Sequence, residues 1–278
     1  MYIDFHTHVF PEKIAKKAVD SLTARAKEAH GGKDMLSPCT DGTLDGLKAE
    51  MKESGVSISV VMPVVTAPRQ FDSINSYAAE INGKSGIYSF GGIHPDCENP
   101  DEKLDLIKSA GLKGVKMHPA YQNCVIEDER YVRIARHCME KGLYMTFHAG
   151  YDIAFPETDF CTPDGVIKAF SGLFEEFDEE SHPHVILAHL GGLKSGAEAL
   201  RKLCGLPIYL DLACTASNMT DKEVEKIIKA HGAEKILFAS DCPWQSQTES
   251  IRQLERLNLT ADEKELISHK NAERILFG

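Results

Sequence analysis

Histidines and an aspartate stand at the ends of apolar segments in this sequence. The first of these segments closes with His6 and His8, which are separated by one residue. Because alternate residues of a strand face the same side, two imidazoles at this spacing can bind one metal ion. An HxH pair is a weak signal by itself in a chain with 12 histidines. Its position at the end of an apolar run is what favours a metal site.

Three more polar residues have the same position relative to a strand. His148, His189 and Asp241 each come at the end of an apolar run. In a barrel of parallel strands, the carboxyl ends of all strands share one face, and active sites are built on that face. Burying these groups together without an ion would cost several kcal/mol in desolvation free energy. The sequence therefore predicts a metal centre on the carboxyl face of a barrel.

The order of the predicted elements supports such a barrel. Eight short apolar runs alternate with longer stretches in which apolar residues recur at helical spacing. The candidate strands are 2–6, 58–63, 88–93, 114–118, 143–148, 184–189, 208–212 and 236–240, and the candidate helices are 74–82, 102–110, 128–141, 163–176, 221–231, 250–257 and 261–276. Residues 11–54 exceed one crossover helix and predict a helical insertion or a lid beside the first strand. We predict an α/β fold, a (β/α)8 TIM barrel slightly elaborated after strand 1, with residues 1–278 in a single domain.

Composition and charge restrict the class of partner. A formal net charge of −11 disfavours binding to nucleic acid or to anionic membrane surfaces. No run approaches about 18 consecutive apolar residues, and no secretory signal is visible. The 8 cysteines include no CxxC pair, which predicts reduced thiols. We expect a cytoplasmic enzyme that acts on a small molecule, and the sequence leaves homo-oligomer formation open.

Six motifs, in order along the chain, resemble those of the amidohydrolase-related metal-dependent hydrolases. They are His6-Thr7-His8, Gly92-Ile93-His94-Pro95, Gly114-Val115-Lys116-Met117-His118-Pro119, Phe147-His148-Ala149-Gly150, Ala188-His189-Leu190-Gly191-Gly192 and Ala239-Ser240-Asp241-Cys242-Pro243-Trp244. The resemblance covers nearly the whole chain, and residues 270–276 are similar to the usual ending of that family.

The resemblance implies a ligand set. It gives His6, His8, His148 and Asp241 as ligands of one divalent ion, with His189 as the nearby acid/base or oxyanion-stabilising residue. Mixed imidazole and carboxylate ligands suit Zn2+, with Mn2+, Fe2+ or Co2+ as alternatives. We therefore predict zinc as the cofactor.

Four further residues are candidates for substrate contacts. Lys116 and His118 share one face of the fourth strand, where either could bind a substrate anion; in some relatives a lysine there is carboxylated and bridges two metals. His94 is either a pocket residue or part of a structural turn. Arg69 is the arginine near an early strand end. Tyr121, Tyr151 and Trp244 could shape the pocket. Cys242 is interpreted as an unreactive thiol. No function is assigned to the remaining histidines, His30, His137, His182, His184, His231 and His269.

The ligand set is compatible with two reactions. The first is hydrolysis of an amide, lactone or ester bond in a small, carboxylated molecule. A zinc ion can lower the pKa of a bound water to about 7, Asp241 would take its proton and pass it to the leaving group, and His189 would stabilise the tetrahedral intermediate.

The alternative is non-hydrolytic loss of carbon dioxide from an unsaturated or aromatic acid, as in aminocarboxymuconate-semialdehyde decarboxylase and its relatives. An arginine that holds the substrate carboxylate would favour this reaction. A barrel without catalysis and a metal-free lactonase are both disfavoured, because every predicted ligand position carries a competent residue.

Overall fold

Parallel strands close into a barrel in the computed structural model, which describes residues 1–179 and 183–278. One sheet has the order β1-β2-β3 and the other β4-β5-β6-β7-β8-β9, and all pairs are parallel. The strands are β1 (Ile3–Thr7), β2 (Ile58–Val61), β3 (Ile87–Ser89), β4 (Gly91–Gly92), β5 (Gly114–Met117), β6 (Tyr144–Phe147), β7 (Val185–Leu187), β8 (Tyr209–Asp211) and β9 (Ile236–Leu237).

Two sets of backbone hydrogen bonds join these sheets into one barrel. Only Phe90 separates β3 from β4, and its amide donates to the Val61 carbonyl at 2.9 Å, so the two pieces act as one strand. At the other seam, the Phe5 amide donates to the Phe238 carbonyl at 2.9 Å. The predicted eight-stranded α/β barrel is confirmed.

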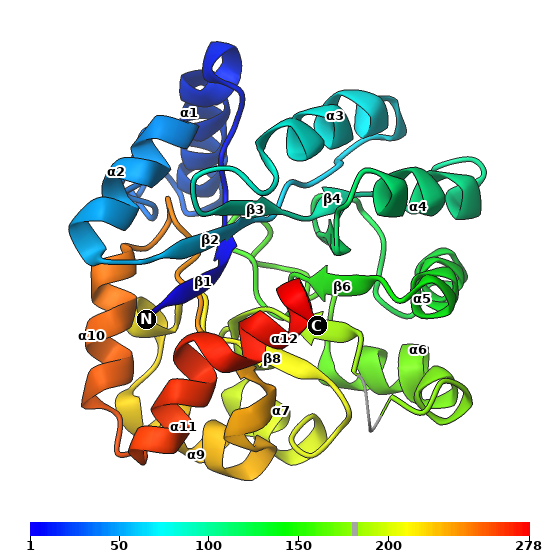
Figure 1. The fold of residues 1–278 in the computed structure, drawn as a ribbon. Helices are drawn as coiled ribbons and strands as arrows, with labels where there is room; N and C mark the ends of the chain where they lie inside the picture. The colour runs from blue at the N-terminus through cyan, green and yellow to red at the C-terminus, as the bar shows by residue number, and fades with distance from the viewer. Residues whose placement is uncertain (180–182) are drawn as a thin grey trace.

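Helices surround the strands (Figure 1). The helices are α1 (Glu12–Ala29), α2 (Leu44–Ser54), α3 (Phe71–Ile81), α4 (Pro100–Ser109), α5 (Glu129–Lys141), α6 (Pro163–Glu176), α7 (Gly196–Lys202), α8 (Thr215–Asn218), α9 (Asp221–His231), α10 (Gln247–Arg256), α11 (Ala261–Glu265) and α12 (Asn271–Phe277). The predicted insertion holds α1 and α2. The predicted helix 261–276 is instead three segments, because a π-helical turn, Leu266–Lys270, lies between α11 and α12.

The amino end of the barrel is filled with apolar side chains. Ile3, Phe5, Val60 and Phe90 point inward and are fully buried, and Ile275 of α12 packs against them. In Figure 1, α12 and both termini lie over this end. A packed lower layer leaves the opposite, carboxyl end of the barrel for polar groups.

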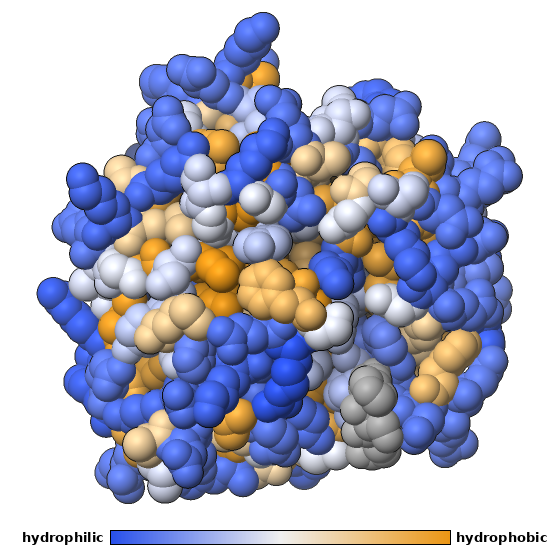
Figure 2. Space-filling model, in the orientation of Figure 1, coloured by the Kyte–Doolittle hydropathy of each residue, from blue (hydrophilic) through white to orange (hydrophobic). Residues whose placement is uncertain are grey.

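Hydrophilic residues cover most of the face shown in Figure 2, and a smaller group of hydrophobic residues lies near its centre. Among the described residues, no helix combines the length and the hydropathy that crossing a membrane requires.

We expect the buried His231 to make the free energy of unfolding depend on pH. The side chain is buried; its Nε2 donates to the Ile208 carbonyl at 2.8 Å and its Nδ1 accepts from the Gly205 amide at 3.3 Å. Burial lowers its pKa to about 4, whereas an unfolded histidine titrates near about 6.5. The unfolded chain therefore binds the extra proton between these values, and stability falls as the pH falls through this window.

We expect His231→Gln to weaken this dependence. Between pH 7 and pH 4, the wild-type free energy of unfolding should fall by up to about 3 kcal/mol more than that of the variant. Urea titrations at several pH values measure the difference, and His137→Gln on the surface of α5 is the matched control. Equal pH slopes for wild type and His231→Gln would contradict the prediction.

Candidate metal centre

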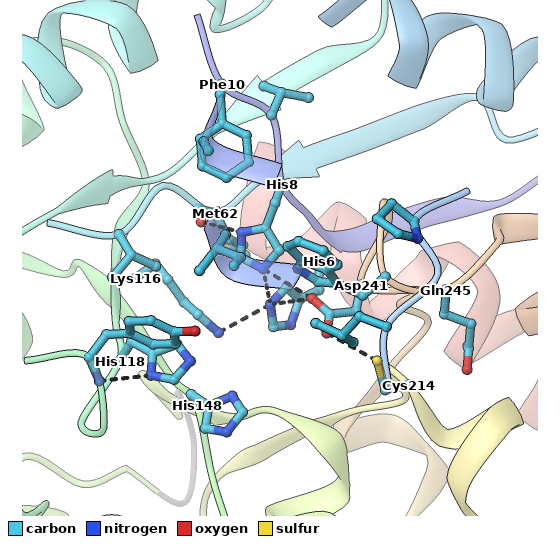
Figure 3. Close-up of a pocket in the computed structure, with 18 of the residues that line it drawn as sticks. His6, His8, Phe10, Met62, Lys116, His118, His148, Cys214, Asp241 and Gln245 are labelled. Carbon is cyan, nitrogen blue, oxygen red and sulfur yellow. Dashed lines mark hydrogen bonds and ion pairs between the residues drawn. The ribbon is translucent and has the colours of Figure 1, made fainter. Parts of the chain in front are cut away.

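Three of the predicted ligands converge at the carboxyl end of the barrel (Figure 3). His8 Nε2 lies 3.2 Å from His6 Nε2 and 3.0 Å from Asp241 Oδ1, and His6 Nε2 lies 3.5 Å from the same oxygen. The Asp241 amide donates to the His6 carbonyl at 2.8 Å, which fixes the segment after β9 against β1. These three side chains could hold one metal ion.

The protonation of the two imidazoles is set by their outer nitrogens. His6 Nδ1 is 2.8 Å from Asp211 Oδ2, and His8 Nδ1 is 2.9 Å from the Met62 carbonyl oxygen. Because both partners are acceptors, each Nδ1 carries the hydrogen and each Nε2 presents a lone pair, which in His6 also lies 3.1 Å from Lys116 Nζ. Asp241 Oδ1 is buried without a hydrogen bond. Three electron pairs facing one another fit a divalent cation.

The charges of these residues also suit a cation. Burial lowers the pKa of His6 to about 4, so its ring is neutral at pH 7. Burial opposes ionisation of Asp241, but the neighbouring His6 and His8 outweigh it and hold the pKa of this carboxyl well below its usual range. Neutral imidazoles and an ionised carboxylate are the forms that bind a metal.

Asp241 is oriented by a neighbouring thiol and by its backbone. Cys214 Sγ donates to Asp241 Oδ2 at 3.1 Å, which turns the other carboxylate oxygen toward the histidines. Asp241 has φ +76° and His189 has φ +60°, a left-handed conformation that L-residues rarely adopt. Strained residues of this kind gather at functional sites.

The fourth predicted ligand lies in an adjacent cluster. His148 Nδ1 is 3.0 Å from His189 Nε2, and His189 Nδ1 is 2.9 Å from the Ala213 carbonyl oxygen. His189 Nδ1 therefore donates, its Nε2 accepts from His148, and His148 Nε2 is left buried without a hydrogen bond. His148 Nε2 is 3.6 Å from Asp152 Oδ2, and His118 Nε2 is 3.4 Å from the same Asp152 oxygen. The role of His148 as fourth ligand stays a prediction.

Two glycines allow the loops that carry His148 and His189 to meet. Gly150 has φ +72°, and a Cβ added there would lie 2.5 Å from the Gly192 Cα. No larger residue fits between the two backbones. Gly150 of the fourth motif and Gly192 of the fifth are therefore explained by this close approach.

Sequence reasoning missed three residues of the site: Asp211, Cys214 and Asp152. Asp211 Oδ2 faces His6, while its Oδ1 accepts from the His189 amide at 2.8 Å, so one carboxylate orients both residues. A charged residue within the apolar run 208–212 was a usable signal, since buried aspartates need partners. Cys214 and Asp152 lie in loops without such a signal.

A cavity of about 1230 Å³ opens over the metal centre. Lys116, His118, Tyr121, Tyr151 and Trp244 line it, as do the four predicted metal ligands and His189. Lys116 is buried, with Nζ 3.1 Å from His6 Nε2, and burial lowers its pKa to about 8.

Two candidates for substrate contacts are not among the residues that line this cavity. Arg69 is exposed on a short turn, Pro68–Gln70, and Gln70 lines the cavity instead. His94 Nδ1 accepts from the Asp96 amide at 3.0 Å, which is the geometry of a structural turn. His182 lies outside the described residues.

Residues 3–278 match a family model described as Amidohydrolase. The chain belongs to the amidohydrolase family. No curated protein matches its sequence. The match therefore confirms the family that the ordered motifs predict, and it spans every residue of the candidate metal centre.

Several solved structures share the fold at low sequence identity. 5-Carboxyvanillate decarboxylase from Sphingomonas paucimobilis has a TM-score of 0.70 and 16% identity, covering 99% of this chain and 98% of that chain. 2,6-Dihydroxybenzoate decarboxylase from Rhizobium has the same TM-score, identity and coverage. Dihydroxybenzoic acid decarboxylase from Polaromonas, with bound manganese and 2-nitroresorcinol, has a TM-score of 0.70 and 13% identity, covering 99% and 96%.

Proposed function

We propose that this amidohydrolase-family protein is a metal-dependent, non-hydrolytic decarboxylase of a small aromatic or unsaturated carboxylic acid. The observation that carries the proposal is the position of Lys116, buried beside the His6, His8 and Asp241 cluster in the same cavity. A cation site next to an ammonium group suits a carboxylate. The structural similarity to decarboxylases of hydroxybenzoates supports this reaction over hydrolysis.

One divalent ion would be held by His6, His8 and Asp241, with His148 as the proposed fourth ligand. When bound, the ion supplies positive charge that attracts the carboxylate and stabilises negative charge on a neighbouring oxygen. Manganese is bound in the Polaromonas enzyme, so we propose Mn2+ or Zn2+ as the metal.

The remaining steps, which are carboxylate binding and proton transfer, would be carried out by residues of the chain. Lys116 would bind the substrate carboxylate. Loss of carbon dioxide requires one proton at the carbon that loses it, and Asp241, which lines the cavity, would deliver that proton. Because its pKa lies well below the usual range, Asp241 is ionised at rest and would first take up this proton from water in the cavity before passing it to the substrate carbon. His189 would act as the nearby acid/base residue, and its Nε2, which accepts from His148 Nδ1, also orients the His148 ring.

Hydrolysis of an amide, lactone or ester is the second candidate. The family description and the three converging electron pairs also fit that chemistry. Its weakness here is that the similar structures of stated activity named above are decarboxylases. The geometry of the metal centre is common to both reactions.

Product analysis separates the two candidates. We expect metal-loaded protein to release carbon dioxide from 2,6-dihydroxybenzoate or 5-carboxyvanillate and, in heavy water, to place deuterium on the ring carbon. A parallel panel of amides, lactones and esters in 18O-labelled water tests hydrolysis. Label in those products without carbon dioxide from any acid would overturn the decarboxylase proposal.

A further inference from the structure

Beyond the metal centre, the cavity continues between the barrel mouth and the inserted helix α1. Its wall starts directly after the ligands, because Val9 and Phe10 follow His8 and both line the cavity. Met62, whose carbonyl oxygen accepts from His8 Nδ1, lines it too. Figure 3 shows Phe10 and Met62 beside His8. The apolar wall is therefore continuous with the candidate metal centre.

Helix α1 supplies the outer wall. Ile14, Ala18 and Leu22 line the cavity at four-residue intervals, so they share one face of the helix. Ala15 and Val19, on another face, are buried. The helix thus packs on the protein with one side and presents a second apolar side to the cavity.

Hydrogen bonds hold the segment that carries this wall at both ends. Just before α1, the Phe10 amide donates to the Gly42 carbonyl at 2.8 Å. Just after α1, His30 Nε2 lies 3.0 Å from the Ile153 carbonyl oxygen, in the loop that follows β6. The space enclosed is therefore part of the fold.

Apolar side chains are left uncovered inside this space. Ile14 is 50% exposed and Met35 is 41% exposed, and both line the cavity. They are two of the six large hydrophobic side chains that are exposed among the described residues. Ile74 and Tyr77 of α3 line the cavity as well. Exposed apolar groups that share one concave site are typical of a surface that a ligand covers.

Size and charge narrow the class of ligand. Cavities of about 300–1000 Å³ already hold drug-sized molecules, so a single-ring acid would leave much of this 1230 Å³ cavity unfilled. Among the described residues that line it, Lys116 is the one lysine or arginine, and Glu249 adds a negative charge. A phosphate-bearing extension would find no second cationic partner among the described residues that line the cavity.

We infer that this apolar chamber, lined by Phe10, Ile14, Leu22, Met35, Ile74 and Tyr77, binds an alkyl or arylalkyl group on the substrate acid. The substrate is then an amphiphilic acid, with its carboxylate at Lys116 and its apolar tail beneath α1. The inference that the substrate is a carboxylic acid rests on the proposed function, whereas the inference that it carries an apolar tail rests on the residues that line the chamber.

The single tryptophan of the chain makes binding measurable without turnover. Trp244 lines the cavity, so its fluorescence should change when a ligand enters. The probes are 2,6-dihydroxybenzoate and its derivatives with an alkyl chain at ring position 4, from methyl to hexyl, added to manganese-loaded protein. We expect Kd to fall about fourfold for each added methylene until the chamber is filled.

Two matched variants test whether α1 is the wall that the tail contacts. Ile14→Glu puts a charge into the chamber at a position that is 50% exposed. Leu106→Glu changes a leucine on α4 that is 59% exposed and does not line the cavity. We expect Ile14→Glu to remove most of the gain in affinity per methylene. Leu106→Glu should keep the wild-type dependence on chain length.

The outcomes separate this inference from the proposed function. Stronger binding of longer chains without carbon dioxide release supports the chamber and overturns the decarboxylase proposal. Turnover of 2,6-dihydroxybenzoate with a Kd independent of chain length overturns the chamber alone. A chain-length dependence that Ile14→Glu and Leu106→Glu share equally also overturns it, because the tail would then lie elsewhere.

Discussion

Replacing His8 with alanine is expected to remove the bound divalent ion and to lower turnover on the order of 1000-fold or more. His8 Nε2 is the atom closest to both other members of the cluster, at 3.2 Å from His6 Nε2 and 3.0 Å from Asp241 Oδ1. Without it, a site of few ligands loses one electron pair and its geometry. Elemental analysis of purified wild type should find about one ion per chain, and of His8→Ala close to none.

His94→Ala is the matched control for this experiment. His94 also follows a strand, and it is buried where His8 is partly buried, but it does not line the cavity. Its variant should keep both metal and turnover. Full metal content in His8→Ala would mean that the ion is held elsewhere, and about two ions per wild-type chain would indicate a second metal bridged by Lys116.

The convergence of His6, His8 and Asp241 could be predicted because strand ends are visible in the sequence. Apolar runs that end in His6, His8 and Asp241 place polar atoms at the carboxyl end of the barrel, and β1 and β9 are neighbours across its seam. Closure of the barrel places the first and last strands side by side, and this brings the polar residues at their ends together. Seven of the eight predicted strands, however, end one to three residues earlier than predicted, and the first ends one residue later. His148 therefore lies just after β6, and His189 begins a short 3-10 turn, His189–Gly191, after β7.

The supporting residues could not be predicted with the same reasoning. Asp211 contacts His6 across 205 positions of sequence, and Cys214 contacts Asp241 from a loop whose conformation depends on a left-handed residue. Such contacts depend on side-chain direction and on loop geometry, which periodicity does not encode. Arg69 shows the same difficulty: its sequence position is near a strand end, but its side chain is exposed outside the cavity.

The second large effect is expected from a comparison of His148→Ala with His189→Ala. In the first variant, the buried Nε2 that has no hydrogen bond is removed, and with it the proposed fourth ligand. We expect loss of both metal and activity. In the second, the ion is expected to remain at saturating metal, and kcat to fall about 100-fold, as for removal of one acid–base group.

The hydrogen bond between these histidines sets the limits of this comparison. His189 Nε2 accepts from His148 Nδ1 at 3.0 Å, so His189→Ala also releases the ring of His148. Loss of such an orienting partner lowers metal affinity by about 10–100-fold, which is why metal content is measured over a range of metal concentrations. Titration with manganese should show weaker binding in His189→Ala but no detectable site in His148→Ala.

The reverse pattern would change the assignment of the two clusters. If His148→Ala retained the metal at wild-type affinity, His6, His8 and Asp241 would suffice as protein ligands. His148 would then belong functionally with His118 and Asp152. Asp152 Oδ2 lies 3.4 Å from His118 Nε2 and 3.6 Å from His148 Nε2. In that arrangement, His148 would contact the substrate as one of the residues that line the cavity, and its loss should raise KM while the metal stays bound.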